Sequence, residues 1–427
     1  MKKLEIAGVE IEQVSITKLL FSKEMFIAYI LLAIGLFGVY EVLAERYFSF
    51  SANAFDAGTH IGSSEVAQAM KEAIFGAGGE VKREEPWTIY IANYMYMIYS
   101  GSGIIFLVAL AELFDIAIIK KTAAGFMTLG LCIVFGGLFT IVMDLNVLHM
   151  LAMFSSPNID AGMWLMLPLY SIYIPFVMFE IYLLLTNKKE MVKKIAKGIL
   201  ILSVFIDIIE YYIQAKLFDM NTARHLWTTY PNLTLYFIVS AFVAACGIML
   251  IYSFITYRKT LGEEFGKLTT LLKKTTLVMI IALGAYEALA FLFIDKNWAS
   301  VILFGSFKYD FYIYMFFTMV LPFGLLAFKL YKKELTSLVT ILASISLIVG
   351  TYIGRMLFVY GGNAYPMSDR FGTGFEKYSE YEVAKEFVFF APSIHEVAIV
   401  IGSIGVVILA YSVINKYLSV SKIRDEH

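Results

Sequence analysis

The stretch from Phe135 to Trp164, FGGLFTIVMDLNVLHMLAMFSSPNIDAGMW, joins two apolar segments through a polar connection. The first segment ends in an acidic residue, Asp144, and the second begins at Met163. The connection contains His149 but neither Lys nor Arg. An acidic side chain at the mouth of a membrane helix is costly unless it has a partner or a function. Asp144 is therefore either a helix-end carboxylate in headgroup water or part of a functional site.

The composition is that of an integral membrane protein. The 427 residues are 59% hydrophobic and 16% charged, and the mean hydropathy is +0.74. Several apolar runs reach the roughly 20 residues needed to cross a bilayer. We expect one polytopic domain over residues 1–427, and the net charge of −1 gives no indication of a nucleic-acid partner. Cys132 and Cys246 lie inside apolar runs and are too few to hold an iron–sulfur cluster.

The hydropathy pattern predicts an all-α fold with about ten transmembrane helices. The expected spans are 25–45, 88–113, 123–143, 163–186, 195–214, 231–256, 274–294, 309–331, 336–360 and 392–416. A weak internal repeat relates Pro86 to Pro231 at the start of two spans and Lys188 to Lys332 at the end of two others. This repeat predicts two four-helix units, spans 2–5 and 6–9, flanked by spans 1 and 10.

The distribution of basic residues predicts the orientation. One side of the predicted bundle carries 22 Lys and Arg residues and the other carries 11. Positively charged loops remain cytoplasmic, so both termini are expected in the cytoplasm. Residues 1–24 would be the cytoplasmic N-terminus, and the first helix would be retained because no signal-peptide cleavage site follows it. The two long connections, 46–87 and 361–391, would be outer loops.

With this orientation, most ionisable groups within the spans fall in the outer half of the membrane. They are Glu41, Asp144, Asp207, Glu210, Glu287, Asp310, Arg355, His395 and Glu396. Span 5 also has a polar stripe, in which Ser203, Asp207, Glu210 and Gln214 recur at helical spacing. Such a stripe faces the bundle interior or a water-filled cavity. Two carboxylates one turn apart exceed what helix packing needs, which favours a proton or ligand role.

Arg355 is the strong base within a span, and a guanidinium at that depth should pair with a carboxylate or extend to the outer surface. Haem in a bundle usually requires two histidines at matched depth. His149, His225 and His395 are all peripheral, which argues against haem. The sequence also contains no P-loop, GxSxG or HExxH motif.

Four segments carry a family resemblance. They are Pro86-Trp87 with SGSG three turns later; GGLFTIVMD with His149-Met150-Leu151 and Pro157-Asn158; His225-Leu226-Trp227; and Arg355 with Gly361-Gly362, Pro392-Ser393 and Glu396. In order and spacing they resemble the NrfD/PsrC family, the membrane subunits of polysulfide reductase and related respiratory complexes. The closest resemblance is to the ten-span branch that includes the membrane subunit of periplasmic hydrogenases. The chain departs from the family at Asn146-Val147-Leu148, where family members often have Gly-Arg-Pro.

The resemblance implies a quinone-binding subunit in a prokaryotic cell membrane, with menaquinone as the expected quinone. It implies neither haem nor a metal in this chain. Its pocket would lie near the outer face, against a ferredoxin-like iron–sulfur subunit that connects it to a catalytic subunit. The chain would then be a quinone-reactive part of an oxidoreductase complex and not an enzyme by itself.

Quinol oxidation releases two protons with two electrons, so such a site needs a base and hydrogen-bond partners for two oxygens. For this acid–base role we expect Asp144 and His149. The residues expected to bind the quinone are Tyr94, His225 and Arg355. The residues expected to form a proton route are Asp207, Glu210, Glu287 and Glu396.

Two other classes of protein remain open at this point. An ion-coupled secondary transporter would also have ten spans, a repeat and buried acids, but it would place them near the midplane with broken helices. A purely structural membrane anchor would fit the long loops but not the acidic stripe. Fluorescence quenching by a bound menaquinone, or its co-purification, would distinguish the three.

Overall fold

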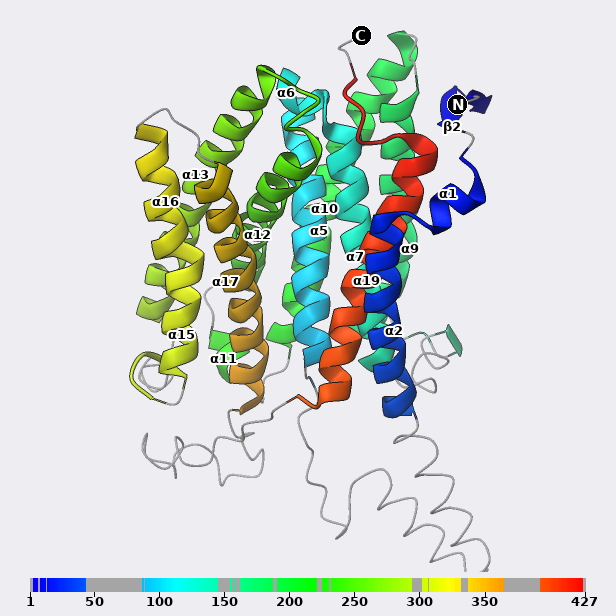
Figure 1. The fold of residues 1–427 in the computed structure, drawn as a ribbon. Helices are drawn as coiled ribbons and strands as arrows, with labels where there is room; N and C mark the ends of the chain where they lie inside the picture. The colour runs from blue at the N-terminus through cyan, green and yellow to red at the C-terminus, as the bar shows by residue number, and fades with distance from the viewer. Residues whose placement is uncertain are drawn as a thin grey trace, which may run out of the picture.

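The computed structural model shows a bundle of long helices that lie side by side (Figure 1). It describes residues 3–6, 8–12, 14–43, 87, 89–144, 154–155, 157, 162–186, 190–220, 225–229, 232–293, 302–305, 307–331, 337–364 and 392–424. Helix α11 (His225–Thr229) lies at one end of the bundle, and both chain termini lie at the other (Figure 1). These two ends are called the α11 end and the termini end.

Ten helices in the described residues are long and apolar enough to cross a membrane, which confirms the predicted all-α membrane fold. In lipid every backbone N–H and C=O must be paired within the protein, and a helix pairs them within one segment. The elements are β1 (Lys3–Ile6), β2 (Val9–Glu12), α1 (Ile16–Leu20), α2 (Lys23–Leu43), α5 (Ile89–Leu113), α6 (Ala117–Lys120), α7 (Ala123–Asp144), α9 (Gly162–Leu185), α10 (Glu190–Asp219), α12 (Leu233–Thr256), α13 (Glu264–Phe293), α15 (Lys308–Met315), η2 (Phe316–Val320), α16 (Leu321–Tyr331), α17 (Ser337–Ala364) and α19 (Ile394–Leu418).

The spans between α2 and α19 form two four-helix units, as the internal repeat predicts. In the first unit α5 packs on α7 and α10, and α9 closes the ring between α7 and α10. In the second unit α12 packs on α13 and α17, and span 8 closes the ring between them. Helix α5 also contacts α12 and α17, and it is 83% buried whereas α2 is 28% buried. The centre of the protein is therefore the contact between α5 and the second unit.

The two flanking spans lie together on one side of the bundle. Helices α2 and α19 pair with each other, and α19 also packs on α7 of the first unit. At their crossing a Cβ on Gly35 would collide with the backbone of Gly402, and the reverse is also true. Small residues at such contacts allow helix backbones in a membrane to approach closely.

A cluster of aromatic side chains holds the two units together at the α11 end. The ring of Trp227 lies 5.0 Å from that of Trp87 and 5.1 Å from that of Phe218. Its indole N–H donates to the carbonyl oxygen of Phe358 over 3.0 Å. A side chain at position 362 would occupy the space of this indole, which explains the glycine there. Trp227 thus joins α11 to both units.

Span 8 is not a regular α-helix throughout, because a π-helical turn, η2, separates α15 from α16. Pro322 begins the following turn and has no N–H for the carbonyl four residues before it. The neighbouring Phe317 carbonyl accepts a hydrogen bond of 2.6 Å from Ser346 of α17. The helix therefore stays continuous across the irregular turn.

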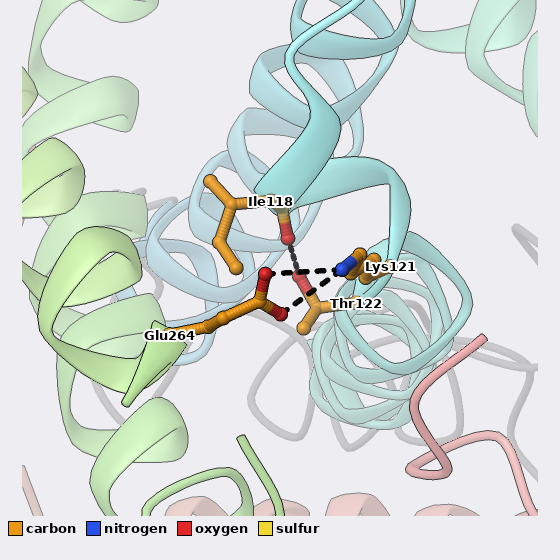
Figure 2. A network of polar contacts seen from close by, with 4 residues as sticks. All are labelled: Ile118, Lys121, Thr122 and Glu264. Carbon is orange, nitrogen blue, oxygen red and sulfur yellow. Dashed lines mark hydrogen bonds and ion pairs between the residues drawn. The ribbon is translucent and has the colours of Figure 1, made fainter. Parts of the chain in front are cut away.

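At the termini end, an ion pair joins the two units (Figure 2). Lys121 Nζ, just after α6, lies 3.0 Å from Glu264 Oε2 at the start of α13. Beside it, Thr122 Oγ1 donates to the carbonyl of Ile118 over 3.2 Å. The side chains of the ion pair are 21% and 39% exposed. Partly exposed pairs of this kind contribute about 0 to 1 kcal/mol, so the pair orients the units more than it stabilises them.

The two chain termini meet at the same end. Strand β2 packs against α9 and α19, and its Glu12 carboxylate contacts the Lys422 ammonium. Arg424 Nη1 donates to the carbonyl of Leu185, the last residue of α9, over 3.0 Å. The N-terminal hairpin and the C-terminal tail therefore cover the termini end of α9.

Candidate functional site

The first four-helix unit contains a cavity of about 410 Å³ at the α11 end. All four of its helices contribute to the wall, which is mostly apolar and includes Ile91, Leu138 and Ile174. The cavity reaches the protein surface between α7 and α9, where Val142 is 48% exposed and Ser171 is also exposed. An apolar pocket with few polar groups is the usual form of a small-molecule site. Its mouth opens on the apolar outer surface of the bundle.

Besides the Trp87 indole and the exposed Ser171 hydroxyl, four residues bring polar groups to this cavity. Asp144 is at the end of α7, Tyr94 is on α5, Tyr170 is on α9 and Gln214 is on α10. Asp144 is half-buried, whereas the other three are 8%, 8% and 2% exposed. The structure thus brings together Asp144 and Tyr94, two of the site residues expected from the sequence. It adds Tyr170 and Gln214, which the sequence analysis did not assign to the site.

A chain of hydrogen bonds leads from the cavity wall to a buried carboxyl group. The Tyr94 hydroxyl donates to Tyr170 over 3.1 Å, and the Tyr170 hydroxyl donates to Glu210 Oε1 over 2.9 Å. Gln214 Nε2 donates to the same Glu210 oxygen over 3.1 Å and to the Tyr170 hydroxyl over 2.6 Å. Glu210 therefore lies directly behind the cavity wall and is linked to it by tyrosine and amide groups.

Arg355 does not lie in this cavity, and the expected ion pair with a carboxylate is wrong. It lies between the units on α17, 3% exposed, and makes no ion pair in the described part of the chain. Its guanidinium carbon is 4.6 Å from the ring centre of Tyr99 and 5.1 Å from that of Phe237. One guanidinium nitrogen donates to Ser240. Cation–π contacts can be worth about 2 kcal/mol when they are desolvated. Aromatic faces thus replace the expected carboxylate.

Glu287 lies in the second unit, away from the cavity. It is 3% exposed, and its Oε1 accepts a hydrogen bond of 2.8 Å from Tyr314. Both residues line a cavity of about 20 Å³, which is room for one water molecule. Glu287 is therefore not part of the same site as Asp144.

The polar residues of the two units lie on equivalent helices. The pairs, 142 to 145 positions apart in the sequence, are Tyr94 and Tyr236, Asp144 and Glu287, Tyr170 and Tyr314, and Glu210 and Arg355. Three of these pairs keep their chemical type, and Tyr236, Glu287 and Tyr314 line the much smaller cavity of the second unit.

The other expected site residues fall outside this arrangement. His149 lies outside the described residues, as does the side chain of His225, whose backbone belongs to α11. Glu396 forms a capping box with Ser393 at the start of α19, so it has a structural role there. Asp207 is fully buried on α10, one turn beyond Glu210. Only Asp207 of these four has a described side chain near the cavity wall.

Tyr170 could not be assigned to the site from the sequence, because a single Tyr in an apolar span has no distinguishing pattern. Pro168 and Pro175 lie on either side of it within α9. Each proline removes one backbone hydrogen bond from the helix. Two prolines seven residues apart were the available signal that this part of span 4 differs from ordinary lipid-facing helix.

Among the residues that the structure describes, no group of three His, Cys, Asp or Glu side chains could hold a metal ion. What the site offers is an apolar space with carboxyl, hydroxyl and amide groups at its wall. Fold and site together define a polytopic membrane protein with a pocket that is open toward the lipid side of the first unit.

The comparison with family models agrees with this description. Residues 80–366 match the model described as polysulphide reductase, NrfD, and the chain belongs to this family. The family consists of membrane subunits generally associated with quinone-reactive respiratory oxidoreductase complexes, usually paired with an iron–sulfur subunit. None of the curated proteins matches the chain. The matched region contains both four-helix units and the cavity.

Proposed function

We propose that this chain is the quinone-binding membrane subunit of a respiratory oxidoreductase complex, with the quinone ring in the cavity of the first unit. The observation that carries the proposal is the cavity itself, about 410 Å³ and apolar, with its mouth between α7 and α9. A quinone diffuses within the bilayer, so a mouth on the apolar side of the bundle gives it direct access. Menaquinone is the quinone we propose.

The wall of the cavity fits the needs of a quinone. A quinone head is a flat apolar ring with two oxygens, each of which needs a hydrogen-bond partner. Tyr170 and Gln214 bring a hydroxyl and an amide to the inner wall, where they would have to redirect hydrogen bonds that they now donate to Glu210, and Asp144 provides a carboxyl group at the end of α7. Trp87 and Tyr94 add aromatic surface. The polar groups are therefore few and come from different helices, as recognition of two separate oxygens requires.

A quinone supplies the chemistry of the site, which is the transfer of two electrons together with two protons. The protein must then accept or deliver protons at the ring oxygens. Asp144 can do so as an acid–base group close to the α11 end, with His149 as a further group in this role. The Tyr94 and Tyr170 hydroxyls connect the cavity with Glu210. Asp207, one turn from Glu210 on α10, continues the proposed proton route, whereas Glu287 and Glu396 lie apart from it.

We place the iron–sulfur subunit at the α11 end, which is the proposed outer face. The cavity lies at this end, so electrons would travel the shortest distance to the partner and through it to a catalytic subunit. Helices α2 and α17 end, and helices α5 and α19 begin, at this end (Figure 1). His225 and Arg355 were expected to bind the quinone. We propose that they influence the site indirectly, His225 from its place in α11 and Arg355 from the contact between the two units.

Quinone binding tests the proposal. Isothermal titration of the purified protein with a short-chain naphthoquinone should show one site. Ser171→Trp places an indole at the cavity mouth. It should weaken binding of the naphthoquinone at least about tenfold, because the indole and the quinone ring would occupy the same space. The control is Phe179→Trp on the same helix, where the side chain is 43% exposed and does not line the cavity. Equal binding by both variants would rule out this cavity.

Topology provides a second test. Single cysteines introduced in 46–87 and 361–391 should react with an impermeant reagent added outside, and cysteines next to Lys188 or Lys332 should not. The native Cys132 and Cys246 are both 0% exposed, so they should contribute little background. The expectation rests on the excess of basic residues at the termini end. The opposite labelling pattern would reverse the proposed outer and cytoplasmic faces.

A further inference from the structure

Arg355 carries a buried positive charge at the contact between the two units. The residue is 3% exposed, and within the described ranges it forms no ion pair. Its Nη2 nitrogen donates to Ser240, and Nη1 has no hydrogen-bond partner among the described residues. The guanidinium faces the rings of Tyr99, Tyr236 and Phe237. Aromatic rings therefore stand where a counter-ion would be expected.

Packing does not explain a cation at this place. Removal of a charge from water is costly, and apolar residues of similar volume often stabilise a buried contact equally well or better. The Ser240 hydroxyl does not depend on the guanidinium either, because it donates to the carbonyl of Tyr236 over 2.5 Å. An ionisable group within a membrane span is usually functional. The role of Arg355 is then to be found in what its charge acts on.

Two carboxyl groups lie within electrostatic reach of this region, one in each unit. Glu287 interacts with Arg355 itself, and Glu210 interacts with Tyr99, which the guanidinium contacts. Each acid accepts a hydrogen bond from a tyrosine of its own unit. Arg355 occupies the position in the second unit that Glu210 occupies in the first. The second unit thus has a base where the first has an acid, and that base lies against the first unit.

The cavity of the first unit lies within range of the charge. The guanidinium carbon is 5.1 Å from the ring centre of Phe237, which is 5.9 Å from the ring centre of Phe218. Phe218 lines the cavity, so the guanidinium is at most about 11 Å from a ring in the cavity wall. At an effective dielectric constant of about 20, two unit charges at that distance change an equilibrium about tenfold.

We propose that Arg355 acts on the cavity through its charge and favours ligands that carry negative charge there. The inference rests on the proposed function and adds a residue that tunes the site without contacting the ligand. Electrons that arrive at a bound quinone bring negative charge, which protons then neutralise. A positive charge already in place lowers the free energy of the charged state without any rearrangement of the protein. The aromatic rings around Arg355 hold it in that place.

Binding of a charged and an uncharged naphthoquinone to the purified full-length protein tests the proposal. Menadione is neutral, whereas 2-hydroxy-1,4-naphthoquinone has the same ring system and is an anion at pH 7. Arg355→Met removes the charge and keeps a long unbranched side chain. It should weaken binding of the anion about five- to tenfold more than binding of menadione, the range that the Coulomb interaction gives.

Two further variants separate charge from packing at the same position. Arg355→Gln is also neutral but can still donate to Ser240, so it should behave like Arg355→Met. Arg355→Lys keeps the charge and loses the planar group, so it should retain the native preference for the anion. If the two neutral variants keep the native ratio of affinities, or if Arg355→Lys loses it as they do, the charge is not what acts on the cavity.

The matched control is Lys308→Met, which removes another cation that packs on an aromatic ring. Lys308 Nζ lies 5.0 Å from the ring centre of Tyr309, at the start of α15. Tyr309 is 68% exposed, so water and salt screen this charge. The control should bind both ligands with the native ratio of affinities. A change equal to that of Arg355→Met would show that any loss of positive charge has this effect, and the proposal would be wrong.

The outcomes also distinguish this inference from the proposed function. If the native protein does not bind menadione, the proposed function fails. If menadione binds and Arg355→Met weakens both ligands equally, Arg355 only supports the contact between the units, and the inference alone is wrong. Glu287→Gln removes an acid near the guanidinium, so it should not lower the relative affinity for the anion. A fall in that variant would mean that packing at this contact, and not charge, governs binding.

Discussion

Asp144→Asn should lower quinone-linked turnover by about 10²- to 10⁴-fold, the usual worth of a positioned acid–base group. The amide keeps the size of the side chain and can still form hydrogen bonds, but it cannot exchange a proton at the end of α7. Asp144 is half-buried at the cavity wall, so it can reach both a quinone oxygen and the water beyond the α11 end. Assembly of the complex and binding of a naphthoquinone should survive.

The measurement is turnover per assembled complex, beside the melting temperature. A carboxylate with only a structural role would give the opposite result, namely lower stability and yield with turnover nearly unchanged. The control is Asp310→Asn, which removes an exposed carboxyl at the α11 end of the second unit, remote from the cavity. An unaffected rate in Asp144→Asn would remove this residue from the site.

Trp227→Ala should cost about 3 to 5 kcal/mol of folding free energy, the range for truncating a buried Trp. The indole is fully buried and packs against Trp87 and Phe218. Its N–H donates a hydrogen bond to the carbonyl of Phe358. Its removal leaves a cavity and deletes the hydrogen bond to Phe358 at the contact between the two units. The expected result is a large fall in the melting temperature of the detergent-solubilised protein.

An exposed aromatic residue provides the comparison for this variant. Phe114→Ala removes a side chain that is 76% exposed at the termini end, and its effect should be within about 0.5 kcal/mol. Similar melting temperatures for the two variants would show that the aromatic cluster does not hold the units together.

The architecture was predictable for two reasons. Bilayer thickness sets the length of each span, and backbone N–H and C=O groups without hydrogen bonds are so costly in lipid that each span must be a helix. The repeat seen in Pro86 and Pro231 also predicted the division into two units, since each unit closes its own ring of four helices. The sequence did not show that spans 1 and 10 pair with each other beside the first unit. Their contact depends on Gly35 and Gly402, and single glycines in apolar runs are too common to indicate a partner.

The site was predictable only where a polar residue stood out in an apolar run. Asp144 and the acidic stripe of α10 did so, and the structure places Glu210 directly behind the cavity wall. Tyr170 did not, because its role depends on a neighbour 76 positions away, Tyr94. Arg355 was expected to meet a carboxylate on charge alone. The guanidinium is instead stabilised by cation–π contacts with the rings of Tyr99 and Phe237. These contacts depend on ring positions that a sequence does not specify.

The pairing of the first span with the last has a consequence for biogenesis. A ribosome delivers spans to the membrane in order, so α2 is inserted long before its partner α19 has been synthesised. Until then the Gly35 face of α2 has only lipid beside it, and Glu12 lacks the Lys422 that it contacts in the finished protein. A chain that loses its last span, through a premature stop or proteolysis, leaves α2 in that unfinished state. Membrane quality-control proteases could therefore recognise an incomplete chain by α2 without its partner, at the beginning of the chain, although the defect lies at its end.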